Sequence, residues 1–255
     1  KEGLAYKPNK ASRARNFLEG RKGAATRAGR VTQNERDADG KYVGAPARFN
    51  TPQKIGKLRR ILNQLAKEGE AGRFWYENSS RAILRMTGYD KKEARKLTAL
   101  LSIYSPQAKV DTNGTFALRA WAIYQSGQPL WEEGVPVKIK SGDQDRKAQR
   151  ALDDIDAYWE SYWAGEKTNN FFWNLLSEIE SGTEGSQGAT IDMWMMRAAQ
   201  YDHDAPNNSE YRFMENEVNR IAQNLGWEPQ QVQAAIWVAM KARMENDQVK
   251  DLTDA

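Results

Sequence analysis

The sequence predicts an all-α protein that carries a basic, irregular N-terminal arm. Apolar residues recur three to four positions apart through most of residues 51–255, the spacing of one helix face. Gly, Pro and cap-forming residues stand where these stretches start and stop. Residues 1–50 are rich in Gly, Ala and Arg and show no such spacing. We therefore expect a flexible arm over 1–50 and one multi-helix domain over 51–255, with about nine helices.

The composition excludes several classes of site. There is no Cys, so disulfides, thiol nucleophiles, iron–sulfur clusters and cysteine zinc sites are excluded. His203 is the single histidine, so we expect no metal and no cofactor. No stretch approaches the roughly 20 apolar residues of a membrane-spanning helix. We expect no membrane partner, and a location in the cytoplasm of a bacterial host cell or inside a virion.

The positive charge is concentrated in the arm. Residues 1–50 contain 12 Lys and Arg against 5 Asp and Glu, a net charge of +7, although the whole chain carries only +4. Such an arm can hold nucleic acid through phosphate contacts. The alternative is a solvated tail with no partner.

The first predicted helices have clear boundaries. Thr51 can cap a helix that begins at Pro52 and ends before Gly69. A second helix is expected over Trp75–Met86. Asp90 and Glu93 are spaced like a capping box that opens a third. The apolar faces of the first and third helices comprise Ile55, Leu58, Leu62, Leu65, Ala94, Leu97, Leu101 and Tyr104.

The remaining elements follow from breaks and periodicity. Pro106 ends the third helix, and Asp111 or Thr112 starts the next. Residues 127–142 hold Gly, Pro and alternating apolar residues, which predicts a loop or one short hairpin arm. A longer helix is expected over 148–162. The last expected helices cover residues 171–179, residues from 193 on, residues 214–225 before Gly226, and residues from Pro229 on.

Two segments between helices carry candidate functional side chains. Ser105, Gln107 and Asn113 surround the Pro106 break, where a polar side chain can project outward. Lys167 precedes an aromatic-rich helix, at the positive end of its dipole, which favours the neutral amine. The alternatives are an ordinary helix stop and a solvated lysine.

Asp192 is the third candidate. It stands at the start of an apolar helix, where a carboxylate usually caps the exposed amides. Its chemical alternative is a fixed negative charge that stabilises a cationic sugar. We expect the helix dipole and the neighbouring amides to keep it ionised.

In this order, the segments resemble the helix-hairpin-helix DNA glycosylase superfamily, of the endonuclease III and 8-oxoguanine glycosylase types. The run Tyr-Ser-Pro-Gln-Ala at 104–108 is similar to the family's Leu-Ser-x-Gln-Ala segment. Gly-Glu-Lys at 165–167 resembles the hairpin that delivers the catalytic lysine. Ala-Thr-Ile-Asp-Met-Trp-Met-Met-Arg at 189–197 is similar to Val-Asp-x-His-x-x-Arg. The resemblance covers roughly residues 75–245 and suggests a divergent phage-encoded member.

The resemblance implies a glycosylase with possible abasic-site lyase activity on double-stranded DNA, without a metal. Lys167 is then the nucleophile, and Asp192 is the carboxylate that supports charge development. The remaining implied site residues are the DNA contacts Gln107, Ser105, Asn113, Gly165 and Arg197, and the base-pocket residues Trp194, Phe171 and Trp163.

The sequence also departs from the family pattern. The hairpin Leu-Pro-Gly-x-Gly is replaced by Trp-Ala-Gly-Glu-Lys at 163–167, and Trp194 stands where the family has His. Residues 51–255 are mildly acidic. Two alternatives therefore stay open: a phage virion or interaction protein that keeps the scaffold without catalysis, and a DNA-binding module. The enzyme hypothesis requires Lys167 and Asp192 to face one aromatic-lined cleft near Gln107.

Overall fold

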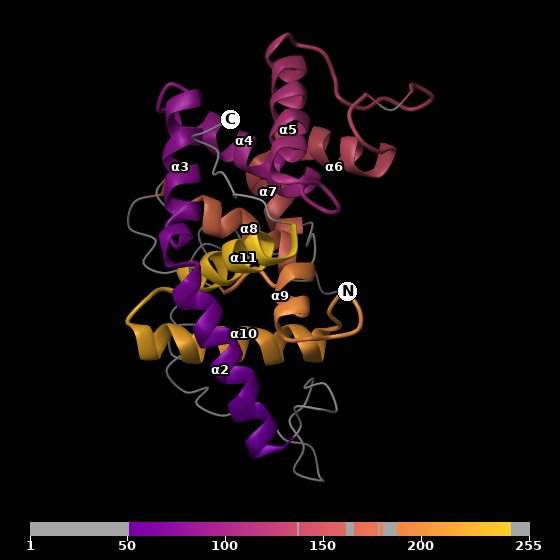
Figure 1. Ribbon diagram of the computed structural model, residues 1–255. Coiled ribbons are helices and arrows are strands. Elements are labelled where there is room, and N and C mark those ends of the chain that lie inside the picture. Colours follow the sequence, from indigo (N-terminus) through magenta and orange to yellow (C-terminus); the bar gives the residue numbers. More distant parts are fainter. Residues whose placement is uncertain (1–50, 137, 162–165, 178, 181–187, 246–255) are drawn as a thin grey trace, which may run out of the picture.

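The computed structural model describes residues 51–136, 138–161, 166–177, 179–180 and 188–245 (Figure 1). Every regular element within these ranges is a helix, which confirms the predicted fold class. None of the helices in these ranges combines the length and the apolar character needed to cross a membrane. The elements are α2 (Pro52–Glu68), η2 (Glu70–Gly72), α3 (Trp75–Met86), α4 (Lys91–Tyr104), α5 (Val110–Gln125), α6 (Gly142–Asp153), α7 (Ile155–Ser161), α8 (Glu166–Leu175), α9 (Met193–Ala198), α10 (Asn208–Leu225) and α11 (Pro229–Glu245).

The helices pack around two hydrophobic clusters. One cluster joins α2, α9, α10 and α11, and the other joins α3 through α8. In Figure 1, α11 lies between α2 and α10 below it and α4, α5 and α6 above it. Ala234 of α11 belongs to the second cluster, and Trp237 packs against both. Because α11 contributes to both clusters, it forms the wall that the two halves share.

Local sequence signals set many of the helix boundaries. The Thr51 hydroxyl accepts the amide of Lys54, and Asp90 accepts two amides of α4. Gly226 adopts the left-handed conformation that ends α10, with φ of 66°. The predicted span Trp75–Met86 is the observed span of α3. These signals act within one turn of chain, so they need no tertiary contact to be effective.

Other boundaries differ from the predictions. α5 begins at Val110, one or two residues earlier than expected, after Lys109 in an extended conformation. The expected helix over 148–162 is two helices, because Asp154 is extended and its side chain caps α7 through the amide of Ala157. α8 begins at Glu166 instead of 171. The described residues of 127–142 contain no strand.

The turn after α2 lies very close to α11. A Cβ built on Gly69 would lie 1.9 Å from the carbonyl oxygen of Ala235, and one built on Gly72 would lie 2.5 Å from a methyl of Val238. Real Cβ contacts are never this short, so the backbone of η2 can cross α11 only because both positions are glycine. This crossing connects the first cluster to the start of α3 in the second.

Gly69→Ala should therefore destabilise the fold by about 3 kcal/mol, since the clash is with rigid helix backbone and cannot be relieved by a side-chain movement. Gly56→Ala is the matched control, because a Cβ there meets nothing closer than 4.0 Å. It should be neutral or stabilising by about 0.5 kcal/mol in the interior of α2. Urea unfolding of both variants tests the prediction, and equal midpoints would contradict it.

Candidate active site

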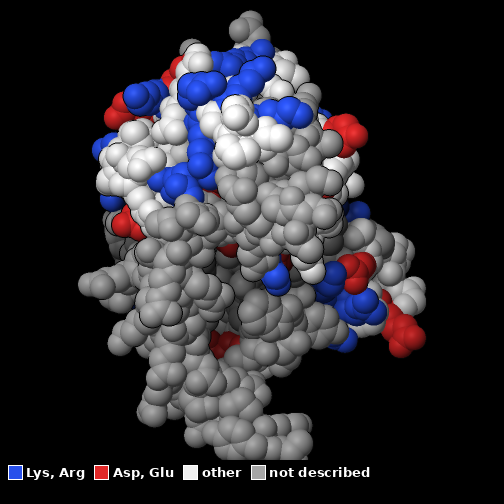
Figure 2. Space-filling model, turned by 90° about the horizontal axis from the view of Figure 1, so that it is seen from below, with Lys and Arg blue, Asp and Glu red and all other residues white. Residues whose placement is uncertain are grey.

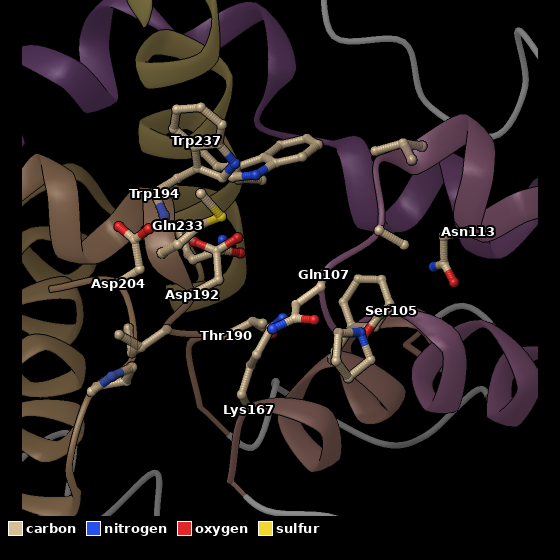
Figure 3. A pocket seen from close by; sticks show the side chains of 18 of the residues that line it. Ser105, Gln107, Asn113, Lys167, Thr190, Asp192, Trp194, Asp204, Gln233 and Trp237 are labelled. Atoms are coloured by element: carbon tan, nitrogen blue, oxygen red, sulfur yellow. Dashed lines mark hydrogen bonds between the residues drawn. The ribbon is translucent and has the colours of Figure 1, made fainter. Parts of the chain in front are cut away.

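A cavity of about 850 Å³ lies between the two hydrophobic clusters (Figure 3). One side comes from α3, the loop between α4 and α5, and the start of α8. The other side comes from the segment 190–194, the loop before α10, and α11. A concave site between two packed halves, with apolar walls and a few polar groups, is the usual setting of a ligand pocket.

The cavity brings together most of the residues singled out from the sequence. Lys167 and Asp192 both line it. Lys167 extends toward Gln107 in Figure 3. The other predicted residues that line it are Ser105, Asn113, Phe171 and Trp194. The two candidate catalytic residues therefore share one cleft with Gln107, as the enzyme hypothesis requires.

Other predicted residues have different surroundings. Asn113 is buried, and its Nδ2 donates to the carbonyl of Leu101 at 3.0 Å, so it ties α5 to α4 instead of projecting outward. Arg197 does not line the cavity, and its guanidinium donates to both carboxylate oxygens of Asp204, at 2.9 and 2.8 Å. Gly165 and Trp163 lie outside the described residues.

Gln107 has a conformation that a non-glycine residue rarely adopts. Its φ is 58°, in the left-handed region, and its side chain is exposed at the cavity. A residue held in this region persists only when its surroundings fix it. Lys140 provides such a restraint, because its Nζ donates to the carbonyl of Tyr104 at 2.9 Å and to that of Pro106. Lys140 thus fixes the two carbonyls that flank the turn leading to Gln107.

Asp145 in turn fixes the segment that carries Lys140. The side chain is fully buried in α6 and accepts the backbone amides of Lys138, Ile139 and Lys140, at 2.9 to 3.3 Å. It also accepts the hydroxyl of Tyr104 at 3.1 Å. One buried carboxylate therefore organises residues 138–140 and connects them to the end of α4. This contact explains why the segment is not a hairpin.

Asp192 caps α9 and faces the cavity at the same time. Its Oδ1 accepts the amides of Trp194 at 3.0 Å and Met195 at 3.1 Å. Burial raises the pKa of Asp192 above its ordinary value, whereas the charge of Lys167 and the helix amides oppose the rise. Desolvation therefore outweighs the dipole and the amides in setting the direction of the pKa shift, and the ionised state of Asp192 stays a prediction. Lys167 lines the same cavity as Asp192, so its charge acts on the carboxyl group across that space.

Helix α8 holds the segment that leads to Asp192. Its Asn170 donates to the carbonyl of Ala189 at 3.1 Å, and its Asn174 donates to the carbonyl of Gly188 and the hydroxyl of Thr190, both at 3.2 Å. Lys167 stands at the start of the same helix. A single element therefore positions both candidate catalytic groups, since α8 carries one and supports the chain before the other.

Aromatic rings form much of the remaining wall. The rings of Trp75 and Phe171 are stacked with centroids 6.2 Å apart, and Trp237 meets the Trp75 ring edge-on at 5.5 Å. These three side chains and Trp194 all line the cavity. Flat apolar surfaces of this kind suit a planar aromatic ligand.

Gln233 also lines this aromatic part of the cavity, and the sequence analysis did not identify it as a site residue. It is 3% exposed, and its Oε1 accepts the hydroxyl of Tyr76 at 2.8 Å. Burial raises the pKa of Tyr76, so the phenol stays protonated and remains a donor. With the oxygen engaged by Tyr76, the amide NH₂ is the part of Gln233 that can donate to a ligand. The only signal in the sequence is that Gln233 and Trp237 lie four residues apart on one helix.

The described part of the chain contains no cluster of three or more His, Asp or Glu side chains that could bind a metal ion. The polar side chains that line the cavity include amines, amides, hydroxyls and the carboxylates of Glu166, Asp192 and Asp204. Such a set can bind a planar ligand and form a covalent bond through an amine.

The raised pKa of Asp192 predicts a pH-dependent cost to stability. A carboxyl whose pKa is higher in the folded than in the unfolded state favours folding below the unfolded pKa, and that contribution is lost as pH rises through the folded pKa. Asp192→Asn keeps the cap, because Asn caps helices as well as Asp does. The variant should therefore gain stability over the wild type at pH 7.5, and gain less at pH 4.5, in urea unfolding.

Asp90→Asn is the control for this measurement. Asp90 accepts the amides of Lys92 and Glu93 at 2.8 and 3.1 Å, the same pattern as Asp192, but it is exposed to solvent. The Asp90→Asn variant should show no comparable gain in stability at pH 7.5. A loss of stability in Asp192→Asn at pH 7.5 would show that the ionised carboxylate is favourable where it stands.

The comparisons with known proteins give one match. No curated protein and no solved structure matches the chain. The profile of one protein family matches residues 60–244, a range that covers α3 to α10, the second half of α2, nearly all of α11, and every residue that lines the cavity. The chain therefore belongs to the family of unknown function DUF7178.

Proposed function

We propose that this protein is a DNA glycosylase with abasic-site lyase activity. The observation that carries the proposal is the common cavity of Lys167, Asp192 and Gln107, walled by aromatic rings. The partner is double-stranded DNA from which one damaged or modified nucleotide is flipped out. Its base enters the aromatic part of the cavity, and Gln107 on its exposed turn fills the space left in the duplex.

The chemistry follows from an amine and a carboxylate that line the same cavity. The Nζ of Lys167 forms a bond to C1′ of the flipped nucleotide while the bond between C1′ and the base breaks. The base leaves with the bonding electrons and takes one amine proton. The sugar ring then opens to an imine between Lys167 and C1′, and the second amine proton passes to the ring oxygen. Asp192 stabilises the positive charge that develops on the sugar.

Borohydride trapping tests this proposal. The reagent reduces the imine and leaves the protein covalently attached to a duplex that carries an abasic site or a modified base. Lys167→Ala should abolish the adduct, a loss of more than about 100-fold, because it removes the amine that bonds to C1′. Lys109→Ala is the matched control, since Lys109 also lines the cavity but is exposed at its rim, and this variant should keep the adduct.

Adduct formation by the wild type but not by Lys167→Ala supports the proposal and identifies the substrate. The absence of any adduct and of base release on every duplex would overturn it. That outcome would favour the alternative of a phage virion or interaction protein that keeps the helical scaffold. An adduct that survives in Lys167→Ala would assign the chemistry to a different amine.

Gln233 is the proposed group that recognises the base. Gln233→Leu should lower the rate of base excision by about 10- to 100-fold, the range expected for one lost hydrogen bond to a base. Its trapping on an abasic duplex should be unchanged, because that substrate has no base to recognise. Tyr76→Phe removes the hydroxyl that orients the Gln233 amide. It should show a smaller loss of the same kind.

The test measures single-turnover rates for the wild type and Gln233→Leu on two duplexes of the same sequence, one that carries the target base and one that is abasic at that position. A loss in Gln233→Leu that is equal on both duplexes would mean that Gln233 supports the cavity wall and does not read the base.

A further inference from the structure

One face of α2 carries an unpaired row of positive charges. Its members, all exposed, are Lys54, Lys57, Arg60 and Lys67. Among the described residues, none of their side chains takes part in an ion pair or hydrogen bond. At 100° per residue Lys57, Arg60 and Lys67 fall on the side of the helix away from its buried leucines, and Lys54 lies at the edge of that side. We call the four residues the basic stripe.

The stripe is not neutralised by acidic residues of its own helix. Glu68 is the single acidic residue of α2, and it is bound by Arg243 of α11 and by Gln64. The Arg243 hydrogen bond is the main reason why the pKa of Glu68 is lowered. Arg59 points elsewhere and donates to the buried Glu217 of α10 at 2.7 and 2.9 Å. Within the part of the chain that the structure describes, the four stripe charges are therefore exposed and form no ion pair.

Figure 2 views the molecule from the side on which α2 and α10 lie in Figure 1. Lys and Arg side chains gather on part of this face, with fewer acidic side chains among them. The charge distribution along the chain is also uneven, with the positive charge concentrated toward the N-terminus. Residues 1–68 contain 17 Lys and Arg against 6 Asp and Glu, whereas residues 69–255 contain 21 against 28. The stripe thus continues, on a folded helix, the positive charge of the first 50 residues.

We propose that the basic stripe is a docking surface for the phosphate backbone of nucleic acid. Lys54 and Lys67 are 13 residues apart, about 20 Å along a helix, which is the length of about six base pairs of duplex. Phosphate contacts of this kind supply affinity without reading sequence. The stripe lies outside the cavity, so the proposal holds whether or not the cavity excises a base.

The apolar side of α2 argues against a membrane as the partner. A helix that binds at a lipid surface inserts its apolar face between the headgroups. The apolar face of α2 is instead occupied by the first hydrophobic cluster, where Leu58 and Leu62 are fully buried. Apart from Pro52 in the first turn, the exposed positions of α2 are polar or charged, and these suit a hydrated polyanion.

The salt dependence of DNA binding tests the stripe. The stripe variant changes Lys54, Lys57, Arg60 and Lys67 to Gln in the full chain. The matched control changes Arg81, Arg85, Lys91 and Lys92, four exposed basic residues of α3 and α4, to Gln. Both variants lose the same charge and keep residues 1–50. The probe is a fluorescein-labelled 30-base-pair duplex, followed by anisotropy at several salt concentrations.

The stripe variant should reduce the slope of log affinity against log salt by about 3.6, since each of the four lost phosphate contacts removes roughly 0.9. The control should change it by less than about one. Equal slopes in the stripe variant and the wild type, or equal losses in the two variants, would overturn the proposal. Loss of binding to phosphatidylserine vesicles with no change on DNA would overturn it in favour of a lipid surface.

This outcome is separable from that of the proposed function. The stripe variant keeps Lys167 and the whole cavity, so at saturating protein its borohydride trapping should match that of the wild type. A stripe variant with a reduced salt slope but normal trapping supports both proposals. A reduced slope in a protein that traps no duplex supports the docking surface alone.

Discussion

The contact between the turn at Gly69 and the backbone of α11 is the constraint on which the arrangement of the helices depends. Gly69 has no Cβ, so the chain can pass close to the carbonyl of Ala235 where it leaves α2. It then crosses α11 through η2 and enters α3. That crossing places the N-terminal helix beside the C-terminal ones in the first cluster, while α3 starts the second. Because α11 belongs to both clusters, the space between them has one rigid wall, from which Gln233 and Trp237 line the cavity.

Buried polar contacts then fix two further parts of the cavity lining, the turn at Gln107 and the segment before Asp192. Asp145 collects the amides of residues 138–140, and Lys140 from that segment holds the carbonyls beside the Gln107 turn. Helix α8 carries Lys167 and, through two asparagine side chains, supports the chain before Asp192. Side chains that must meet a ligand at a defined place require such support. Burial of Asp192 raises its pKa, a cost to stability of the kind that is often concentrated at functional sites.

Two features of the charge distribution bear on a nucleic-acid partner. Arg197, the arginine that the family resemblance assigns to DNA, is engaged by Asp204 and stacks on the Trp194 ring, 4.8 Å from its centroid. Among the described residues, the basic stripe of α2 is a row of positive charges without ion pairs, and it lies outside the cavity. If the protein binds DNA, phosphate contacts and the reactive groups are therefore divided between different parts of the molecule.

The sequence by itself determined the helical class, the span of α3, and the caps at Thr51, Asp90 and Gly226, because period and capping depend on residues within a turn or two of one another. It also singled out Lys167, Asp192 and Gln107, since each stands at a helix end. Only the tertiary structure decided that these three share a cavity, that Asn113 turns inward, and that desolvation outweighs the amides at Asp192. The roles of Lys140, Asp145 and Gln233 were likewise decided there, because their partners are 5 to 157 residues away along the chain and no local pattern records such contacts.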